Sequence, residues 1–197
     1  MSFFNSHGWS RAKWREHLRT QRQLLSTEYA QESAHRVASH LAADALGQTE
    51  HIALYLSNDG ELDPLAIAHK AWRAGKHLYL PILTAQGMQF CEWFEDQALT
   101  PNRYGIGEPS GKPINPELLQ LLLLPTVGWT GSGFRLGMGG GFYDRFLAAH
   151  KPAATRLGLA YDCQRQDALD ALRENWDQDM DGVLTESGLQ RFGERTY

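Results

Sequence analysis

The chain has little cysteine: Cys91 and Cys163 are the only thiols in 197 residues. Two cysteines cannot form the disulfide framework of a small secreted domain, and the sequence has no Cys/His spacing typical of a zinc site. The fold must therefore be stabilised by a buried apolar core. With 197 residues and 42% hydrophobic residues, we expect one sizeable domain.

Long apolar runs, repeats and a strong excess of charge are also missing. The longest apolar run, around residues 120–127, is far shorter than the roughly 20 residues that span a bilayer, and no signal peptide is evident. A net charge of -4 and a pI of about 6.0 argue against broad binding to nucleic acid or anionic membranes, although a local basic site remains possible. We therefore expect a cytoplasmic protein that binds neither nucleic acid nor membrane.

The most informative stretch is glycine-rich and covers residues 133–145 (GFRLGMGGGFYDR). An apolar run at 121–125 (LLLLP) precedes it, and Phe142, Phe146 and Leu147 follow at helical spacing. This pattern places the glycines between a buried strand and the start of a helix. Glycines without side chains, next to a helix N-terminus, can direct backbone N–H groups at an anion.

Charged residues in this stretch indicate which class of anionic ligand the glycines would bind. Arg135 and Arg145 bracket the glycines, and Asp144 lies beside them. A carboxylate would repel a polyphosphate unless a divalent cation lay between them, so the combination predicts a nucleotide with magnesium. The glycines alone are equally compatible with a flexible surface turn. A Rossmann motif counted from Gly137 would need glycine at Phe142, and the Gly-Lys-Ser/Thr of a P-loop is absent.

Residues 135–145 resemble the signature R-L-G-x-G-x-G-[FY]-Y-D-R of the 5-formyltetrahydrofolate cyclo-ligase family, also called 5,10-methenyltetrahydrofolate synthetases, at every defined position. One departure is Trp129-Thr130, where the family usually has Phe-Asp; the missing acid bears on magnesium or on turn geometry. Further segments resemble family motifs in the same order: 11–15, 56–62, 102–109, 158–164 and 176–185.

The resemblance implies an α/β fold, a single-domain three-layer α/β/α arrangement with a mainly parallel sheet. The alternation of short apolar strands with helices predicts the same class. We expect residues 1–197 to form this one domain, with loose ends at 1–7 and 187–197. The implied activity is ATP-dependent cyclisation of 5-formyltetrahydrofolate to 5,10-methenyltetrahydrofolate, with release of ADP and phosphate. Mg²⁺ is the implied cofactor, ATP the co-substrate, and we expect a monomer.

The resemblance also implies a set of site residues. The catalytic set is Arg135, Tyr143 and Asp144, and the Mg²⁺ ligands are Asp144 and Asp177. The implied ATP-binding residues are Arg11, Arg15, Arg135, Leu136, Gly137, Met138, Gly139, Gly140, Gly141, Phe142 and Tyr143. The implied folate-binding residues are Leu56, Glu61, Met138, Gly139, Gly140, Gly141 and Phe142.

Local patterns place several of these residues. A helix is predicted over 9–25, with Arg11, Arg15, Arg19 and Arg22 on one face; we interpret Arg19 and Arg22 as surface or interface residues. Glu61 follows a predicted strand at 51–57, and ligands of α/β sheets bind at the carboxyl ends of strands. Other expected elements are a helix over 28–46 capped by Ser26, strands at 78–81, 88–95, 120–125 and 155–161, and an ordered loop near the site at 98–118.

Two competing functions stay open at this point. One is a sugar-phosphate isomerase or acyl-CoA transferase on a related sheet, which uses no ATP and for which Glu61 would be the catalytic carboxylate. The other is an inactive folate-binding protein, suggested by Thr130 in place of the family's acid.

Overall fold

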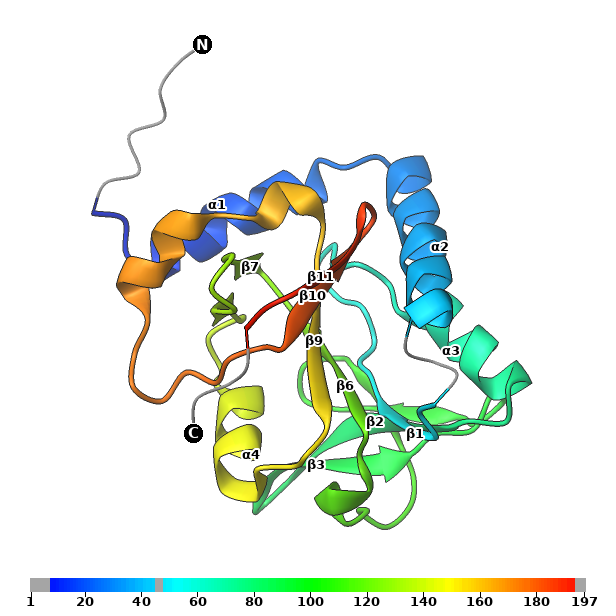
Figure 1. Cartoon of the computed structure of the whole chain (residues 1–197). Coiled ribbons are helices and arrows are strands. Elements are labelled where there is room, and N and C mark those ends of the chain that lie inside the picture. The colour runs from blue at the N-terminus through cyan, green and yellow to red at the C-terminus, as the bar shows by residue number, and fades with distance from the viewer. Residues whose placement is uncertain (1–7, 45–47, 194–197) are drawn as a thin grey trace.

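The structure, a computed structural model, describes residues 8–44 and 48–193 (Figure 1). The loose end expected at 1–7, and residues 194–197 of the one expected at 187–197, lie outside the described residues. A seven-stranded sheet in the order β11–β10–β9–β6–β1–β2–β3 organises the chain. Its strands are β1 (His51–Ala53), β2 (His77–Thr84), β3 (Gly87–Glu92), β6 (Leu121–Pro125), β9 (Thr155–Leu159), β10 (Gly182–Thr185) and β11 (Gly188–Arg191).

The sheet is mainly parallel, as predicted. Strands β10, β9, β6, β1 and β2 pair in parallel, whereas β3 and β11 are antiparallel edge strands. Two small antiparallel pairs lie outside this sheet: β4 (Leu99–Pro101) with β5 (Gly107–Pro109), and β7 (Gly128–Trp129) with β8 (Arg135–Leu136). Short 3-10 helices cover Pro116–Leu118, Asp162–Gln164 and Asp167–Leu172.

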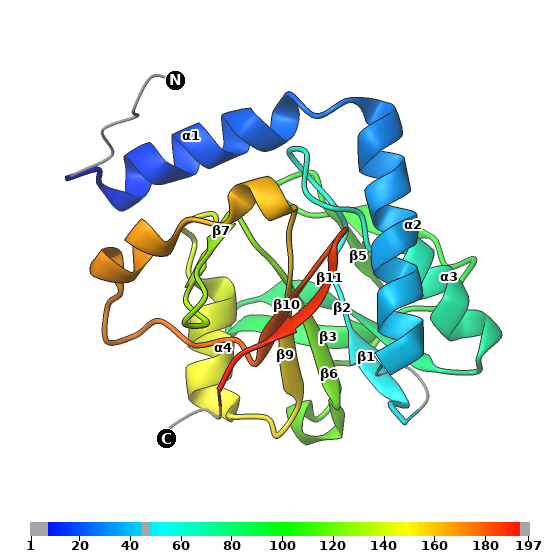
Figure 2. The ribbon, with the colours of Figure 1, turned by 45° about the horizontal axis from the view of Figure 1, so that its top comes forward.

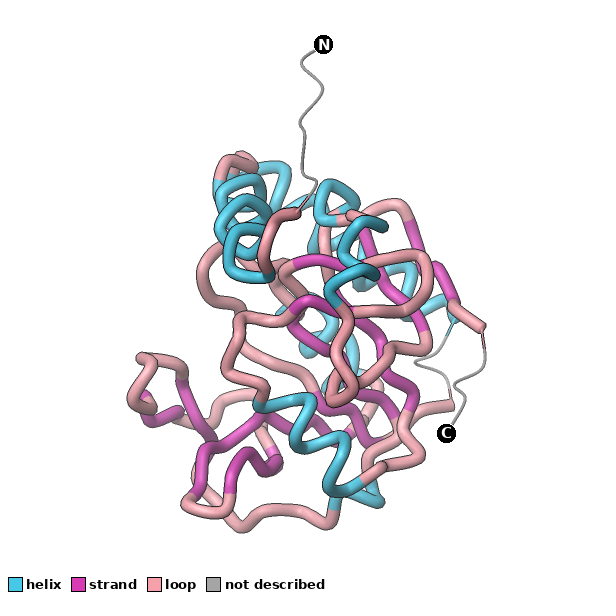
Figure 3. The backbone as a smooth tube through the Cα atoms, turned by 90° about the vertical axis from the view of Figure 1, so that its left-hand side faces the viewer, coloured by secondary structure: helices cyan, strands magenta, loops and turns pink. Residues whose placement is uncertain are grey.

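Helices cover both faces of the sheet. α2 (Thr27–Asp44) and α3 (Leu65–Arg73) pack on one face and α4 (Phe142–His150) on the other, while α1 (Arg11–Gln23) crosses one end of the strands (Figures 1 and 2). Figure 3 views the molecule from the side on which α4 lies, with α4 in front of part of the sheet. The predicted three-layer α/β/α arrangement is confirmed. Across the described residues, no helix combines the length and apolar character needed to cross a lipid bilayer.

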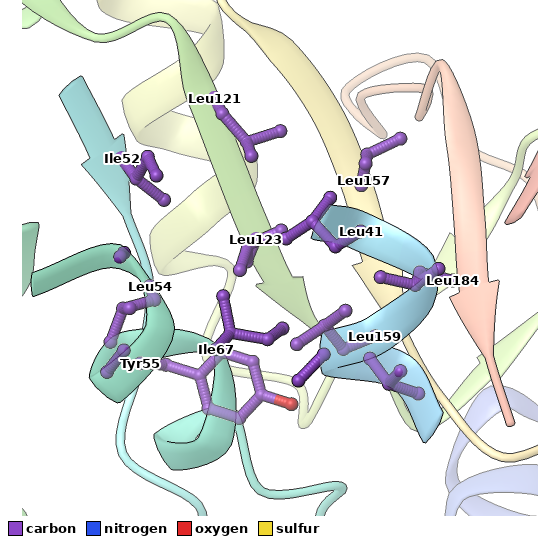
Figure 4. Close-up of a cluster of buried hydrophobic side chains, with 14 of the residues drawn as sticks. Leu41, Ile52, Leu54, Tyr55, Ile67, Leu121, Leu123, Leu157, Leu159 and Leu184 are labelled. Carbon is purple, nitrogen blue, oxygen red and sulfur yellow. The ribbon is translucent and has the colours of Figure 1, made fainter. Parts of the chain in front are cut away.

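Alternation along β6 explains why both faces are covered. Leu121 and Leu123 join the cluster under α2 and α3, and Leu122 and Leu124 join the cluster under α4. Successive side chains of a strand point to opposite faces, so an uninterrupted apolar run must be buried on both. Figure 4 shows the first cluster, where leucines of β6 and β9 meet Leu41 of α2. Full burial of each such side chain contributes about 1.5–3 kcal/mol.

The order of the strands also determines where a ligand can bind. From β1 the chain goes through α3 to β2 on one side, and β6 lies on the other side of β1. The loops that follow β1 and β6 therefore diverge and leave a crevice at the carboxyl ends of the strands, which is the usual ligand position in such sheets.

Helix boundaries follow their capping residues. The Ser10 hydroxyl accepts a hydrogen bond from the Lys13 N–H at the start of α1, and the Ser26 hydroxyl accepts one from the Tyr29 N–H at the start of α2. On the buried side of α1, Trp14 and Leu18 pack against Leu136 in a third apolar cluster. This cluster fastens α1 over the loops that follow β6.

Some expectations about the ends of elements are wrong. Residues 188–191, expected within a loose tail, form β11 because they pair antiparallel with β10, and Leu189 packs on the main apolar cluster. The strand expected at 51–57 stops pairing after Ala53, although the Leu54 N–H still donates to the Tyr79 carbonyl at 2.9 Å. The segment released from the sheet continues into the crevice.

Candidate functional site

A cavity of about 610 Å³ occupies the crevice at the carboxyl ends of the strands. Its wall is made by the loop after β1, by β2 and β3, by the β4–β5 hairpin, by the glycine loop (137–141), by α1 and by residues 174–177. Of the residues predicted from the sequence, Leu136 alone is not on this wall; it is fully buried beneath α1. The predicted residues on the wall are Arg11, Arg15, Leu56, Glu61, Arg135, Gly137, Met138, Gly139, Gly140, Gly141, Phe142, Tyr143, Asp144 and Asp177.

The glycine loop presents its backbone to the cavity. Gly139 has φ +103° and Gly141 has φ +62°, values that side-chain-bearing L-residues rarely adopt. A Cβ added at Gly139 would lie 3.4 Å from Cζ of Arg15. Gly141 precedes α4 and has no side chain to cap the helix, so the first N–H groups of α4 are free to bind a ligand.

Arg15 brings an unneutralised cation to this loop. Its Nε donates to the Gly137 carbonyl at 2.8 Å. Within the described residues no carboxylate lies within ion-pair distance of its guanidinium, and burial and the neighbouring Arg11 lower its pKa. A partly buried cation without a partner carboxylate is energetically costly, and a bound anion would stabilise it.

Two further arginines, Arg11 and Arg135, line the cavity, and each forms an ion pair with an aspartate on the same wall. Arg11 donates Nη1 and Nη2 to the two oxygens of Asp177, at 3.0 and 2.8 Å. Arg135 donates Nη1 to the Pro125 carbonyl at 3.1 Å and Nη2 to both oxygens of Asp144 at 3.2 Å. The Nε of each arginine is buried without a hydrogen-bond partner among the described residues. Buried donors of this kind are rare, and these two belong to residues that line the cavity.

Glu61 and Tyr143 also lie on the cavity wall, where the Arg135 guanidinium lies over the Tyr143 ring at 5.7 Å. Oε2 of Glu61 accepts from the Asn58 N–H at 3.1 Å, and burial raises the pKa of this carboxyl, an effect that Arg22 opposes. Burial and the charge of Glu61 raise the pKa of Tyr143 well above its usual value. The Tyr143 hydroxyl is therefore neutral at physiological pH and can donate a hydrogen bond.

Asp144 and Asp177, the magnesium ligands predicted from the sequence, both already accept hydrogen bonds from protein groups. Asp144 is 17% exposed, and its oxygens accept from Arg135 and, at 3.4 Å, from the Gln178 N–H. Asp177 is 3% exposed and accepts from Arg11 and from the Glu174 N–H. Within the described residues no group of three or more potential metal ligands occurs. Magnesium nevertheless often binds through one or two carboxylates plus substrate phosphates, which Asp144 suits.

Thr130, where the resemblance fails, lies away from the cavity. It is fully buried, donates to Oδ1 of Asp170 at 2.9 Å and accepts from the Phe134 N–H at 3.2 Å. The departure from the family pattern therefore affects the β7–β8 turn and not the wall of the cavity.

Arg22 is the main residue that sequence reasoning placed wrongly. The sequence predicts a surface or interface residue at this position, but Arg22 is 2% exposed and donates to the backbone and side chain of Asp59. The sequence places Arg22 on the same helix face as Arg15 and Arg19, and this pattern does not predict that Arg22 is buried. The β4–β5 hairpin adds residues that were expected only as an ordered loop near the site: Asn102, Tyr104, Ile106 and Glu108.

Comparison with known proteins identifies similar chains. The model of the "5-formyltetrahydrofolate cyclo-ligase family" matches residues 8–186. The 5-formyltetrahydrofolate cyclo-ligase of Escherichia coli K12 is 36% identical over 178 residues, covering 86% of this chain and 97% of the relative. The Haemophilus influenzae enzyme of the same name is 33% identical, covering 86% and 96%.

Solved structures agree with this similarity. An NMR structure of the Aquifex aeolicus 5,10-methenyltetrahydrofolate synthetase superposes with a TM-score of 0.82 at 27% identity, covering 95% of each chain. A Mycoplasma pneumoniae 5,10-methenyltetrahydrofolate synthetase shares the fold, with a TM-score of 0.73 at 20% identity.

Proposed function

Because this chain belongs to the 5-formyltetrahydrofolate cyclo-ligase family, we propose that it uses ATP to cyclise 5-formyltetrahydrofolate to 5,10-methenyltetrahydrofolate. One observation carries the proposal: the glycine loop, three arginines and Glu61 come from distant parts of the chain and line one cavity. The cavity combines a cationic, N–H-rich side for phosphates with an apolar and acidic side for a reduced pterin.

The chemistry explains the need for ATP. The formyl oxygen attacks the γ-phosphorus, the bond to ADP breaks, and an iminium phosphate forms. The N10 lone pair then attacks the formyl carbon. The C–O bond breaks, its electron pair leaves with phosphate, and N10 loses its proton. Phosphoryl transfer of this kind requires mainly positioning and charge compensation.

On the phosphate side, we assign Arg11, Arg15 and Arg135 to the triphosphate together with backbone N–H groups from Leu136 to Tyr143. The position of Arg11 and Arg135 on the cavity wall and the unneutralised charge of Arg15 support this assignment. Leu136 itself is buried under α1, so its contribution is limited to the backbone.

Asp144 is the carboxylate that we assign to Mg²⁺, which would share its coordination sphere with phosphate oxygens and neutralise their charge when bound. Asp177 was predicted as a second ligand. Its two hydrogen bonds with Arg11 support a different primary role, orientation of that arginine toward the phosphates. The metal role of Asp177 stays a prediction.

On the folate side, Leu56 and Glu61 are assigned to the pterin. A carboxylate there can accept hydrogen bonds from pterin N–H groups, and Tyr143 with residues 138–142 lies between the two substrates. The cavity mouth adds exposed apolar side chains for the aromatic part of the substrate, with Tyr104 packed edge-on against Phe142 at 6.2 Å.

Phosphate is proposed to pass directly from ATP to folate. The described residues that line the cavity include no serine, threonine, cysteine or histidine, the usual nucleophiles for a phosphorylated intermediate apart from carboxylates. Retention of radioactive phosphate on denatured protein after incubation with γ-labelled ATP would contradict direct transfer.

The decisive experiment mixes the protein, ATP, Mg²⁺ and 5-formyltetrahydrofolate and follows the methenyl chromophore together with ADP. One ADP per methenyl group is expected, with no product when ATP is omitted. Arg15→Gln should raise the KM for ATP, whereas Arg36→Gln, at an exposed arginine off the cavity wall, serves as the control. Folate binding without chromophore would identify an inactive folate-binding protein. The comparisons give no support to the isomerase or transferase alternative.

A monomeric state and a cytoplasmic location belong to the same proposal. One cavity supplies all the assigned groups from a single chain, so no second subunit is needed to complete it. Sedimentation of the purified protein would test the monomeric state.

A further inference from the structure

Arg22, near the end of α1, is a guanidinium enclosed by protein. Its side chain has no exposed area. Its Nε donates to the Asp59 carbonyl at 2.9 Å and its Nη2 to Oδ2 of Asp59 at 3.0 Å. A buried charge is stable only where hydrogen bonds and paired charges offset the free-energy cost of its desolvation. The contacts of Arg22 must therefore be maintained in the folded protein.

The same guanidinium touches three loops of the cavity. Besides Asp59, Nη1 donates to the Thr126 carbonyl after β6 at 3.5 Å, and Nη2 lies 3.8 Å from Sδ of Met138 in the glycine loop. Nη2 also lies 3.8 Å from Oε1 of Glu61. One side chain thus connects the segment proposed to bind folate with the segment proposed to bind phosphate.

The backbone between these contacts has an unusual conformation. Asp59 has φ +54° and Gly60 has φ +74°, and Glu61 follows directly. A left-handed non-glycine residue costs about 1–2 kcal/mol and needs support from its surroundings. Here Arg19, Arg22 and Gln23 all donate to the Asp59 carboxylate. Side chains from the last two turns of α1 therefore stabilise the conformation of the Asp59–Gly60 segment.

We propose that Arg22 is a positioning residue for reduced-folate binding, which fixes the Asp59–Gly60 turn and directs the Glu61 carboxylate into the cavity. The proposal rests on the folate-binding role proposed for Glu61. It assigns no contact between Arg22 and either substrate, because Arg22 is not on the cavity wall.

Electrostatics give the proposal a measurable signature. Burial raises the pKa of Glu61 and Arg22 opposes this most strongly; Arg135 acts in the same direction as Arg22, and Asp59 in the opposite direction. Without Arg22, Glu61 would hold its proton to a higher pH and would lose its capacity to accept hydrogen bonds from the pterin. The other titratable groups near Glu61, including those across a second cavity of about 320 Å³, are Arg19, Tyr55, Tyr143, Asp63, His35, His69 and Tyr161.

The test compares Arg22→Gln, Arg22→Lys, Glu61→Gln and the double variant Arg22→Gln/Glu61→Gln in steady-state kinetics between pH 5.5 and 8.5, with ATP-free blanks subtracted. Arg22→Gln should raise the KM for 5-formyltetrahydrofolate about tenfold or more and leave the KM for ATP within about twofold. The acid limb of kcat/KM for the folate should move to higher pH.

Two further variants separate positioning from general destabilisation. Arg22→Lys retains the charge but not the fork of donors, so the acid limb should return toward the wild-type position while the KM stays raised. Arg36→Gln is the control, because Arg36 pairs with Glu32 on α2, lies 58% exposed, and is neither on the cavity wall nor bound to Asp59. It should leave both KM values and the pH profile unchanged.

Coupling gives a second criterion. In the Glu61→Gln background, Arg22→Gln should add little to the folate KM, because both substitutions remove the same interaction. Additive effects, or a fall in kcat with unchanged folate KM and pH profile, would overturn the proposal. If Glu61→Gln itself leaves the folate KM unchanged, both the Glu61 assignment and this proposal fail, although the methenyl assay still tests the activity separately. If Arg22→Gln does not fold, Arg22→Lys is judged by the coupling criterion.

Discussion

Arg11 and Asp177, 166 residues apart in the chain, form a two-pronged ion pair at the rim of the cavity. Asp177 is 3% exposed and Arg11 22% exposed, so the pair is shielded from solvent on the carboxylate side. It joins the first turn of α1 to the segment before β10. A carboxylate that holds an arginine at a phosphate site can act through that arginine, without binding the metal itself.

Asp177→Asn tests this distinction. The substitution removes the charge that orients Arg11, so the KM for ATP should rise about 5–10-fold, in line with loss of one charge-assisted hydrogen bond. The Mg²⁺ concentration for half-maximal activity should not change. Asp179→Asn is the control, since Asp179 pairs with Arg173 and is 40% exposed. A higher Mg²⁺ requirement at an unchanged ATP KM would instead assign Asp177 to the metal.

Asp144→Asn should lower kcat about 100-fold and raise the Mg²⁺ requirement, because a neutral amide is a poor ligand for a hard cation and no longer balances Arg135. A Mg²⁺ titration of the variant at saturating ATP measures both effects. Asp167→Asn, at an exposed carboxylate that pairs with Arg165, should behave as the wild type. Unchanged magnesium dependence in Asp144→Asn would refute the metal assignment.

Arg135→Ala should affect stability as well as ATP binding. The Arg135 side chain is 3% exposed, and its removal leaves the Asp144 carboxylate and the Pro125 carbonyl without their donor. Loss of one partner of a buried ion pair costs about 3 kcal/mol, which urea unfolding would detect as a lower midpoint. Arg145→Ala, at an exposed position, should stay within about 0.5 kcal/mol of the wild type. Equal stabilities of the two variants would contradict the structural role of Arg135.

Gly139→Ala tests the backbone of the glycine loop. The positive φ makes any side chain costly by about 1–3 kcal/mol, and the new methyl group would come into van der Waals contact with Arg15. We expect a raised KM for ATP and a smaller change for folate. Gly75→Ala is a matched control: Gly75 also has a positive φ of +70°, but it ends α3 and no atom lies within 4 Å of its added Cβ. The control should lose stability without any change in KM; a parallel loss of ATP affinity there would show that strain alone explains the result.

Much of the fold could be predicted because it depends on local patterns. The run Leu121–Pro125 is apolar at every position, and such a run predicts a strand buried on both faces. Glycines at 139–141 between a strand and a helix predict an exposed backbone, and this prediction does not depend on residues elsewhere in the chain. The matching motifs extend these local predictions to the family and to the residues that line the cavity.

Other features could not be predicted from the sequence, because they depend on where distant segments of the chain meet. Arg19 and Arg22 lie on the same face of α1 and both bind Asp59, yet Arg19 is partly exposed and Arg22 is enclosed, because Arg22 also contacts Thr126 and Met138. The pairing of β11 with β10 likewise required the path of the chain after Thr185.

The amino-acid order by itself therefore determined which segments are strands and helices, where the backbone is bare, and which chemical groups are available. Tertiary structure alone decided which charges are neutralised, which donors are left without partners, and how the pKa of Glu61 is shifted. The physical reason is that periodicity and backbone freedom are properties of neighbouring residues, whereas desolvation and charge pairing depend on groups brought together across the whole chain.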